Sequence, residues 1–421
     1  MDFQDERTSA PTPPSEVEFV VVGAGLAGLA AALTLHRAGR EVLILERDES
    51  VGGRVRTDLE DGYVLDRGFQ VLLTAYPEVA RHIDLDALDL RPFVRGVNVW
   101  DNGSFTELSD PRRSLTALVG GLRTQVLTTR DRVRFLKLAV RLLTSKHGFL
   151  GREDDCSTGE FLETLRFSDR SIEKLWEPLL SGIQLTPSLE GSARLACLIL
   201  RCLLVGPAAV PARGMQEIPN QMAAGLPRGS VHVEVEVEKI NGSEVFLSTG
   251  EVTAARRVIV ATEQPAAARL LKGESFEGRA QWHAYFSATE APSKSEAIHL
   301  LPSVQGPCRN IAIMSNVAPE YAPQGSVLIV AAGPTSGRES HLVEAREQLV
   351  HVFGHQAQSW ELIKQGIVEH AQPMFVPGAN FRRQVQSDQQ IVVAGDHRTT
   401  PSIQGALVSG RLAALEAIHE Q

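Results

Sequence analysis

A glycine-rich turn near the start of the chain constrains its fold most strongly. The apolar run at residues 19–22 leads directly into residues 23–28, GAGLAG, and a helical pattern of leucines and alanines then continues to Gly39. Residues 41–46 form a second apolar run that ends in Glu46. This pattern predicts a strand–helix–strand unit in which the start of the helix binds a pyrophosphate and the acid binds a ribose.

Each glycine of this turn has its own expected role. Gly23 allows the tight turn, Gly25 lets the backbone approach a phosphate, and Gly28 lets the helix lie close to the sheet. A lone GxGxxG motif occurs by chance, but the flanking strands, helix and acid make a chance match much less frequent. The predicted ligand contacts of this unit are Gly23, Gly25, Leu26, Ala27, Gly28, Glu46 and Arg47.

A second fingerprint lies near the other end of the chain. The apolar run at residues 391–394 leads into Gly395 and Asp396, and residues 402–406, SIQGA, follow shortly after. We expect this segment to close over the far end of the same ligand. A ligand held from both ends of a 421-residue chain favours FAD over NAD.

Residues 52–57, GGRVRT, lie shortly after Glu46 and do not belong to the bare dinucleotide fingerprint. Gly52 and Gly53 permit close backbone approach, and Arg54 offers a planar donor group for phosphate or ring carbonyl oxygens. The alternative is a glycine turn beside a solvated arginine.

Taken in order, these segments resemble the flavin-containing amine oxidase superfamily, which includes phytoene desaturases and protoporphyrinogen oxidases. The C-terminal segment is closer to the desaturase-like branch than to monoamine oxidases. The resemblance is carried by residues 23–28, Glu46, 52–54, 65–70 (LDRGFQ), 211–215 (PARGM), 258–262 (VIVAT), 395–396 and 402–409.

The resemblance implies an α/β fold with a discontinuous, glutathione reductase-like Rossmann domain for FAD and a mixed α+β substrate domain. We assign residues 17–75, 211–265 and 366–421 to the FAD-binding domain, and residues 76–210 and 266–365 to the substrate domain. Residues 1–16 are polar and proline-rich, which predicts a disordered tail.

Composition narrows the class of protein. A net charge of −9 argues against a nucleic-acid binder. The four cysteines have no metal-binding spacing and suit a reducing compartment, so we expect no metal and a cytoplasmic location. No apolar stretch reaches the roughly twenty residues needed to span a bilayer. Nothing in the composition sets the oligomeric state.

Strict alternation at residues 231–238 predicts one half-buried strand, and residues 244–248 and 256–261 predict two more. The resemblance implies that the backbone of Val237 binds adenine and that the loop after Ala261 passes near the pyrophosphate. An ordinary β-meander without ligand contact is the alternative.

A helix is predicted around residues 130–146, because Val133, Leu136, Val140 and Leu143 share one stripe, with Phe135, Leu138 and Leu142 beside it. Its basic residues are Arg130, Arg132, Arg134, Lys137, Arg141 and Lys146. A basic amphipathic helix can lie on an anionic membrane, which would make the protein peripheral at a membrane. The alternative, which we favour at this point, is a helix packed into the core with a solvated charged face.

The resemblance places the chemistry on the flavin, which accepts hydride at its N5. It implies that Gly68, Phe69 and Gln70 run beside the flavin, and that Gly395 and Asp396 contact its ribityl chain or phosphates. It also implies that a helix starting near Ser402 directs the amide of Ile403 at the pyrimidine. Arg67 is either a pyrimidine or phosphate partner or part of a salt bridge.

Two absences shape the expected chemistry. No cysteine follows Cys308, which excludes the covalent flavin link of monoamine oxidases, so FAD should be non-covalent. The lysine that amine-oxidising relatives place near flavin N5 has no counterpart on the strand at residues 281–285. His283 is nearest to that position, and the catalytic candidates are therefore only His283, Arg67 and Gln70.

We therefore predict an FAD-dependent oxidoreductase that dehydrogenates an apolar, polyene-type small molecule. An amine or amino-acid oxidase is the alternative among enzymes. A non-catalytic flavin-binding scaffold or membrane-associated partner protein is the alternative from another class.

Overall fold

The structure is a computed structural model that describes residues 13–109, 125–145, 154–186, 188–275, 277–302, 306–337, 339–381 and 390–419. Lys146 and residues 1–12 of the predicted tail lie outside this part. The predicted tail extends too far, because strand β1 (Glu16–Val22) already begins at Glu16, whose neighbour in the sheet is Ala254.

The first large sheet contains the predicted strand–helix–strand unit. Its order is β10 (Val231–His232), β2 (Val42–Leu45), β1, β13 (Val252–Val260), β12 (Glu244–Leu247) and β11 (Val237–Asn241), and β19 (Ile391–Val393) pairs with the second half of β13. The strands β10, β2, β1, β13 and β19 run parallel, whereas β12 and β11 run antiparallel. The apolar runs at the two ends of the chain therefore both pair with β13.

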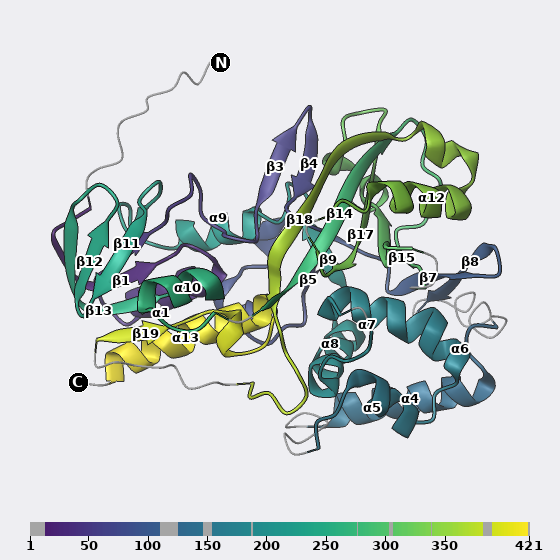
Figure 1. The fold of residues 1–421 in the computed structure, drawn as a ribbon, viewed down its shortest axis with the longest axis horizontal. Helices are drawn as coiled ribbons and strands as arrows, with labels where there is room; N and C mark the ends of the chain where they lie inside the picture. Colours follow the sequence, from purple (N-terminus) through teal and green to yellow (C-terminus); the bar gives the residue numbers. More distant parts are fainter. Residues whose placement is uncertain are drawn as a thin grey trace.

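Helices α1 (Leu26–Arg37) and α13 (Ile403–His419) pack closely against one another beside this sheet (Figure 1). A Cβ atom on Gly410 would overlap the carbonyl oxygen of Ala27, and one on Gly28 would overlap the carbonyl oxygen of Gly23. Gly28 thus has the packing position that the sequence predicted. Gly39 follows α1 with φ +73°, a backbone conformation that favours glycine.

The predicted single strand at residues 231–238 is wrong. Only Val231 and His232 extend the sheet beside β2, and the chain then leaves that edge to join β12 through β11 at the opposite edge. Between them Glu234 adopts φ +57°, and its amide donates to the carbonyl of Asp48 at 3.0 Å. The sequence still alternates here because the side chains of the connecting residues 233–238 are alternately less and more exposed to solvent.

The second large sheet is mostly antiparallel. Its order is β18 (Glu361–Pro373), β14 (Gly278–Ala288), β17 (Val327–Thr335), β16 (Asn310–Ile313), β15 (Ile298–Leu300), β7 (Gly96–Asp101) and β8 (Ser104–Ser109). One face of β14 places Trp282 and Phe286 in a core shared with α12 (Leu342–Phe353). Because side chains alternate along a strand, Gln281, His283 and Tyr285 share the other face.

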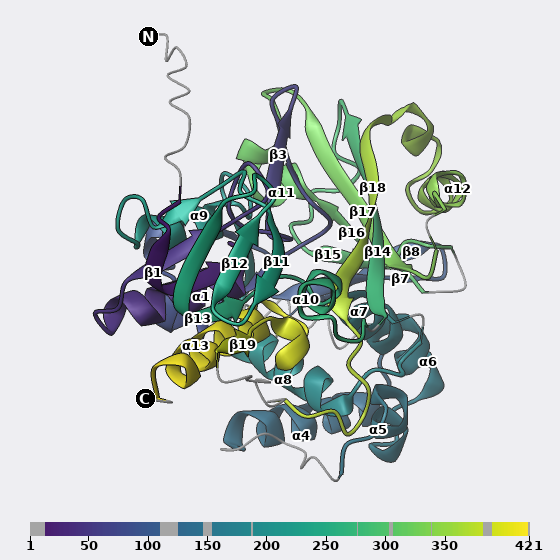
Figure 2. The same cartoon turned by 60° about the vertical axis from the view of Figure 1, so that its left-hand side comes forward.

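Two small sheets and a helical layer complete the described fold. The small sheets are the hairpin of β3 (Thr57–Glu60) and β4 (Tyr63–Asp66), and the strands β5 (Leu72–Leu73), β9 (Ala208–Pro211) and β6 (Leu90–Pro92). The helical layer consists of α4 (Thr129–Thr144), α5 (Thr158–Thr164), α6 (Asp169–Ser171), a π-helical turn (Ile172–Trp176), α7 (Glu177–Gln184) and α8 (Ala193–Val205). It lies opposite the β3–β4 hairpin in both views (Figure 1, Figure 2).

The remaining short helices connect these layers. They are α2 (Val79–His82), η1 (Asp86–Leu88), α9 (Glu217–Ala224), α10 (Gln264–Leu271), α11 (Met314–Val317), η4 (Pro319–Tyr321), η5 (His355–Ser359) and η6 (Asp396–Arg398). None of the helices in the described ranges is both long and apolar enough to cross a bilayer. The architecture is the predicted α/β class, although β18 continues across the domain boundary that we expected at residue 366.

Candidate cofactor site

The two fingerprints meet at one cavity of about 520 Å³ between the first sheet, β18 and the start of α13. Its lining includes most of the residues that the sequence predicted as ligand contacts. These are Gly23, Gly25, Leu26, Ala27, Glu46, Arg47, Gly53, Arg54, Arg67, Val237, Ala261, Gly395, Asp396, Ser402 and Ile403. Segments from the beginning, middle and end of the chain therefore border the same space.

The start of α1 borders this cavity, and the first backbone amides of a helix have no partner within the helix itself. Gly25 is the N-cap residue and provides no side-chain hydrogen bond, and the first turn contains no acid. A Cβ atom on Gly25 would meet no atom within 4 Å, so the space in front of it is open. Free amides and the positive end of a helix dipole favour an anion such as a pyrophosphate.

Glu46 at the end of β2 is connected to the glycine turn. One carboxylate oxygen accepts a hydrogen bond from the amide of Ala24 at 2.6 Å, and the other accepts one from the amide of Asp48 at 3.0 Å. Its side chain is buried and still borders the cavity. Glu46 thus holds the turn in shape, and a carboxylate oxygen retains lone pairs for a further donor.

Arg54 links the two fingerprints directly. Its guanidinium group donates to Asp396 at 2.7 Å, and to the carbonyl oxygens of His370 and Ala371 at 3.3 and 2.8 Å. Burial alone would lower the pKa of Arg54, but the ion pair with Asp396 and the charge of Glu263 hold that pKa above its usual value. The alternative of a solvated arginine beside a glycine turn is therefore wrong.

Two buried polar atoms on the wall of the cavity point to a polar ligand. The hydroxyl of Thr262 and Nδ1 of His370 are buried, and neither has a hydrogen-bond partner within the described residues. Buried polar groups in proteins are nearly always paired. Together with the free amides of α1, these atoms fit the phosphates and hydroxyl groups of FAD.

The sequence prediction missed part of this lining. Glu263 is the N-cap residue of α10, Arg269 lies in the last turn of that helix, and Glu369 and His370 come from β18. The expectation that the loop after Ala261 passes near the pyrophosphate already indicated the region of Glu263 and Arg269. No local pattern indicated the residues of β18, because that strand reaches the cavity only through its pairing with β14.

Gly68, Phe69 and Gln70 line neither this cavity nor the second one described below. Gln281 of β14 accepts from the amide of Phe69 at 2.8 Å, and the side chain of Gln70 donates to the carbonyls of Arg54 and Arg67. Gln70 therefore acts on backbone groups and holds the segment in place.

Arg67 does not pair with Asp66. Its guanidinium group lies 3.0 Å from the carboxylate of Asp58 on β3, and the side chain remains 40% exposed on the cavity wall. Arg67 therefore forms a salt bridge, as the alternative predicted, and its side chain also borders the cavity.

His283 lies on the face of β14 that it shares with Gln281 and Tyr285, but it lines neither cavity. It is buried next to Gly366 of β18, and burial together with the charge of Lys364 lowers its pKa to about 4. Its imidazole is therefore neutral at physiological pH.

The structure also places a lysine in this sheet, although not on β14. Lys364 of β18 is the register partner of Tyr285 and forms ion pairs with Asp58 and Glu60. Burial opposes its charge, but the hydrogen bonds that its ammonium group donates to both carboxylates raise its pKa above the usual value. No sequence signal could reveal it, because the two strands lie about eighty residues apart.

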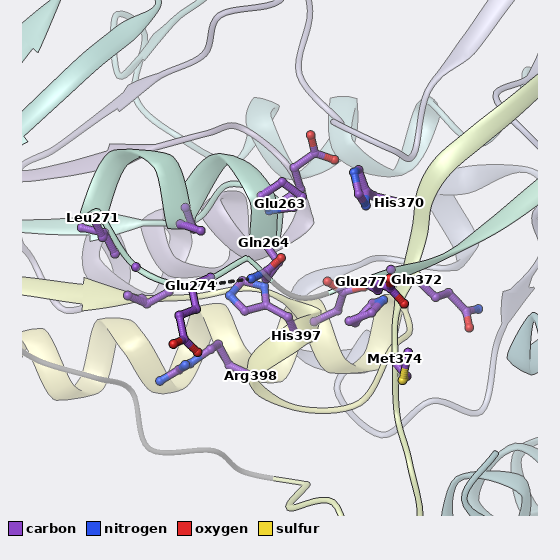
Figure 3. Close-up of a pocket in the computed structure, with 18 of the residues that line it drawn as sticks. Glu263, Gln264, Leu271, Glu274, Glu277, His370, Gln372, Met374, His397 and Arg398 are labelled. Atoms are coloured by element: carbon purple, nitrogen blue, oxygen red, sulfur yellow. Dashed lines mark hydrogen bonds between the residues drawn. The ribbon is translucent and has the colours of Figure 1, made fainter. Parts of the chain in front are cut away.

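A second, larger cavity of about 870 Å³ adjoins the first (Figure 3). The two share Arg54, Glu263, His370 and Asp396. The second is bordered by α10 and its following loop, the end of β18 and η6, and its lining includes Glu274, Glu277, Gln372, Met374, His397 and Arg398. The side chain of Gln264 donates to the carbonyl of Glu274 at 3.0 Å and holds that loop against α10.

Asp66 joins three segments beneath the site. Its carboxylate accepts from Thr57 at 2.6 Å, from the amide of Met215 at 2.8 Å and from Tyr321 at 2.9 Å. The predicted segments at residues 65–70 and 211–215 are thus brought together. Burial outweighs these hydrogen bonds and raises the pKa of Asp66 to about 6.

This carboxylate predicts a specific pH dependence of stability. The folded pKa of about 6 exceeds the usual 3.8, so its contribution to stability is complete below about pH 4 and disappears as pH rises through 6. In Asp66→Asn the amide oxygen can accept from Thr57 and Met215, the amide NH2 can donate to the hydroxyl of Tyr321, and the side chain does not titrate. We expect the stability of this variant relative to the parent to increase by roughly 1–3 kcal/mol between about pH 4.5 and 7.5, measured by denaturant unfolding of the holoprotein.

Asp131→Asn is the matched control. Burial would raise the pKa of Asp131, but hydrogen bonds from Ser168 and Thr128 lower it to about 2, so its contribution is lost only as pH falls towards that value. Its stability relative to the parent should stay constant over the same interval. A constant difference for Asp66→Asn as well would contradict the raised pKa of Asp66.

Known proteins resemble this chain in both sequence and fold. It is 39% identical over 101 residues to an L-amino-acid oxidase of Sistrurus catenatus edwardsii, covering 24% of this chain and 19% of the relative. It is 42% identical over 64 residues to protoporphyrinogen oxidase 2 of Arabidopsis thaliana, covering 15% of this chain and 13% of the relative. The chain thus spans less than a quarter of the length of either relative.

The fold resembles that of an oxidoreductase from Methanosarcina mazei, with a TM-score of 0.74, 20% identity, and coverage of 95% of this chain and 100% of the other. The profile of flavin-containing amine oxidoreductases matches residues 26–418, from the end of the first glycine-rich turn through the whole second fingerprint. The chain belongs to the flavin-containing amine oxidoreductase family and is an FAD-dependent oxidoreductase.

Proposed function

We propose that this FAD-dependent oxidoreductase dehydrogenates a mostly apolar, desaturase-type small molecule. FAD, when bound, supplies the acceptor for a hydride. The protein then has to hold the cofactor, exclude water and position a C–H bond of the substrate. The observation that carries the choice of substrate is that His283 lines neither cavity and that Lys364 is held in ion pairs by Asp58 and Glu60.

The proposed cofactor contacts follow the lining of the smaller cavity. The amides at the start of α1 would bind the pyrophosphate, Glu46 a ribose, and the backbone of Val237 the adenine. Asp396 and Arg54 would contact the middle of the cofactor, and the amide of Ile403 its pyrimidine. Thr262 and His370 offer the unpaired polar atoms that a ligand would satisfy.

We considered two titratable groups on the paired strands β14 and β18, His283 and Lys364, as bases for amine oxidation. Neither is suited to that role. An amine must lose its ammonium proton before it gives up a hydride. With a pKa of about 4, His283 is too weak a base to take that proton at neutral pH. Lys364 is held protonated by Asp58 and Glu60 and has no lone pair to offer. A hydrocarbon carries no ammonium proton, so it needs no base before the hydride leaves; the proton of the adjacent C–H bond would be lost to solvent after the hydride.

Two other functions have support of their own. The similarity to an L-amino-acid oxidase favours an amine or amino-acid oxidase. The similarity over 56 residues to an inactive all-trans-retinol 13,14-reductase of Danio rerio favours a flavin-binding protein without turnover. We further propose that the protein is cytoplasmic and contacts a membrane peripherally. We also propose the division into an FAD-binding domain and a substrate domain, with the last boundary moved from residue 366 to the end of β18.

The choice of substrate can be tested by anaerobic reduction of the bound flavin. We expect primary amines and amino acids to leave the flavin absorbance unchanged over minutes, and one member of a panel of polyenes and porphyrinogens to bleach it. His283→Ala should keep its flavin and most of the rate, because a buried neutral imidazole takes no proton here. Lys364→Gln is the companion variant and should behave in the same way.

Rapid bleaching by an amine that disappears in His283→Ala would replace this proposal with the amine oxidase. Bleaching by no compound at all would favour the flavin-binding scaffold.

The cofactor assignment is tested by Gly25→Val. A branched side chain would fill the open space before the amides of α1, so the purified variant should lose most of its FAD. Acid precipitation of the parent protein should release FAD into the supernatant, identified by mass spectrometry. The matched control is Gly337→Val at an exposed position, which should keep its cofactor. Flavin that stays on the precipitated chain, or NAD in place of FAD, would contradict the assignment.

A further inference from the structure

Helix α4 has two apolar faces, and only one of them is packed. Leu138 and Leu142 are each 2% exposed and belong to the core of the helical layer. On the other face the apolar side chains are open to solvent. They are Val133 at 49%, Leu136 at 64%, Val140 at 52% and Leu143 at 43% exposure, and we call these four the stripe.

The stripe follows the helical spacing, so its side chains lie in one row along the whole helix. Single exposed apolar residues are ordinary, but a contiguous row marks a surface for interaction. Our preferred interpretation from the sequence, a helix packed into the core with a solvated charged face, holds for Leu138 and Leu142 and is wrong for the stripe. The neighbouring face of the helix, with Leu138 and Leu142, packs into the core instead.

The helix does not depend on the stripe for its stability. Thr128 and Asp131 form a capping box at its start, and Asp131 also accepts from the amide and hydroxyl of Ser168 at 2.9 and 2.7 Å. At its end Arg201 of α8 donates to the carbonyls of Leu142 and Ser145 at 2.9 and 2.6 Å. The stripe is thus presented by a helix that is already fixed at both ends.

The charge beside the stripe has one sign. At 100° per residue, Arg130, Arg134, Lys137 and Arg141 fall along one flank and Arg132 along the other. Arg130, Lys137 and Arg141 are exposed. The only acid of this helix is Asp131, which is buried and bound to the cap and to Arg134.

We infer that α4 is a docking face for the surface of an anionic lipid bilayer, which deepens the membrane contact of the proposed function and rests on it. The stripe would enter the boundary between headgroups and acyl chains, and the basic side chains would reach the phosphate groups. A second copy of the chain fits poorly, because two such helices would bring their basic flanks together. In both views α4 lies on the outer side of the helical layer (Figure 1, Figure 2).

The holoprotein is tested on vesicles of phosphatidylcholine alone and with about 30% phosphatidylglycerol, at low and physiological salt. We expect binding to the mixed vesicles at least about tenfold tighter than to the neutral ones, and weaker at higher salt. Leu136→Ser with Val140→Ser should lose at least about tenfold in binding, and Arg130→Gln with Lys137→Gln should lose the preference for anionic vesicles. FAD content reports that each variant is folded.

The matched controls lie elsewhere on the surface. Val343→Ser removes an apolar side chain that is 69% exposed on α12, and Arg228→Gln removes an exposed charge after α9. Both should bind the mixed vesicles as the parent protein does. No binding to mixed vesicles, equal binding to both kinds, or equal losses in the controls would overturn the proposal. The proposal would also be overturned if light scattering showed a dimer that only the variant Leu136→Ser with Val140→Ser dissociates.

The same proteins separate this inference from the proposed substrate. Flavin reduction is measured in detergent micelles, where no bilayer is present. Reduction by an apolar compound without vesicle binding overturns the docking face alone. Vesicle binding without reduction by any apolar compound overturns the substrate and leaves the docking face in place.

Discussion

The ion pair between Arg54 and Asp396 is the contact on which the candidate site depends. The two residues are 342 positions apart, and their side chains meet at 2.7 Å on the wall of both cavities. Arg54 also holds two carbonyls of β18, so one guanidinium group joins the glycine turn, the C-terminal fingerprint and the second sheet. An ion pair in such a partly closed space is worth more than one on the surface, because water screens it less.

Close backbone packing sets the position of that ion pair. The helices α1 and α13 can approach one another only because Gly410 lacks a side chain where it meets the carbonyl of Ala27. Alanine would favour the helix by about 1 kcal/mol, but overlap in a packed core costs about 1–3 kcal/mol or more. The packing requirement therefore prevails over helix propensity at this position. A wider separation would move Ser402 and Ile403 away from the amides of α1.

Local signals predicted the strand–helix–strand unit well, because turn, helix and strand chemistry are short-range. The sequence placed Gly23, Gly25, Glu46 and Arg54 at one ligand, and all four border the cavity. It failed where residues meet through long-range pairing: β18 is far from β14 in the chain, yet it places Lys364 beside Tyr285 and His370 on the cavity wall. The prediction from sequence also failed at residues 231–238, where one regular alternation belongs to strands at two edges of one sheet. It failed on α4 as well, because periodicity does not show which of two apolar faces is packed.

A double-mutant cycle on FAD binding tests most directly whether both ends of the chain form one cofactor site. Arg54→Gln and Asp396→Asn keep the approximate size of each side chain and remove its charge. We predict that each variant weakens FAD binding by about tenfold or more, and that the double variant binds no more weakly than the weaker single one, because the second change removes a contact already lost. Fully additive losses, or unchanged affinity in both single variants, would contradict the account.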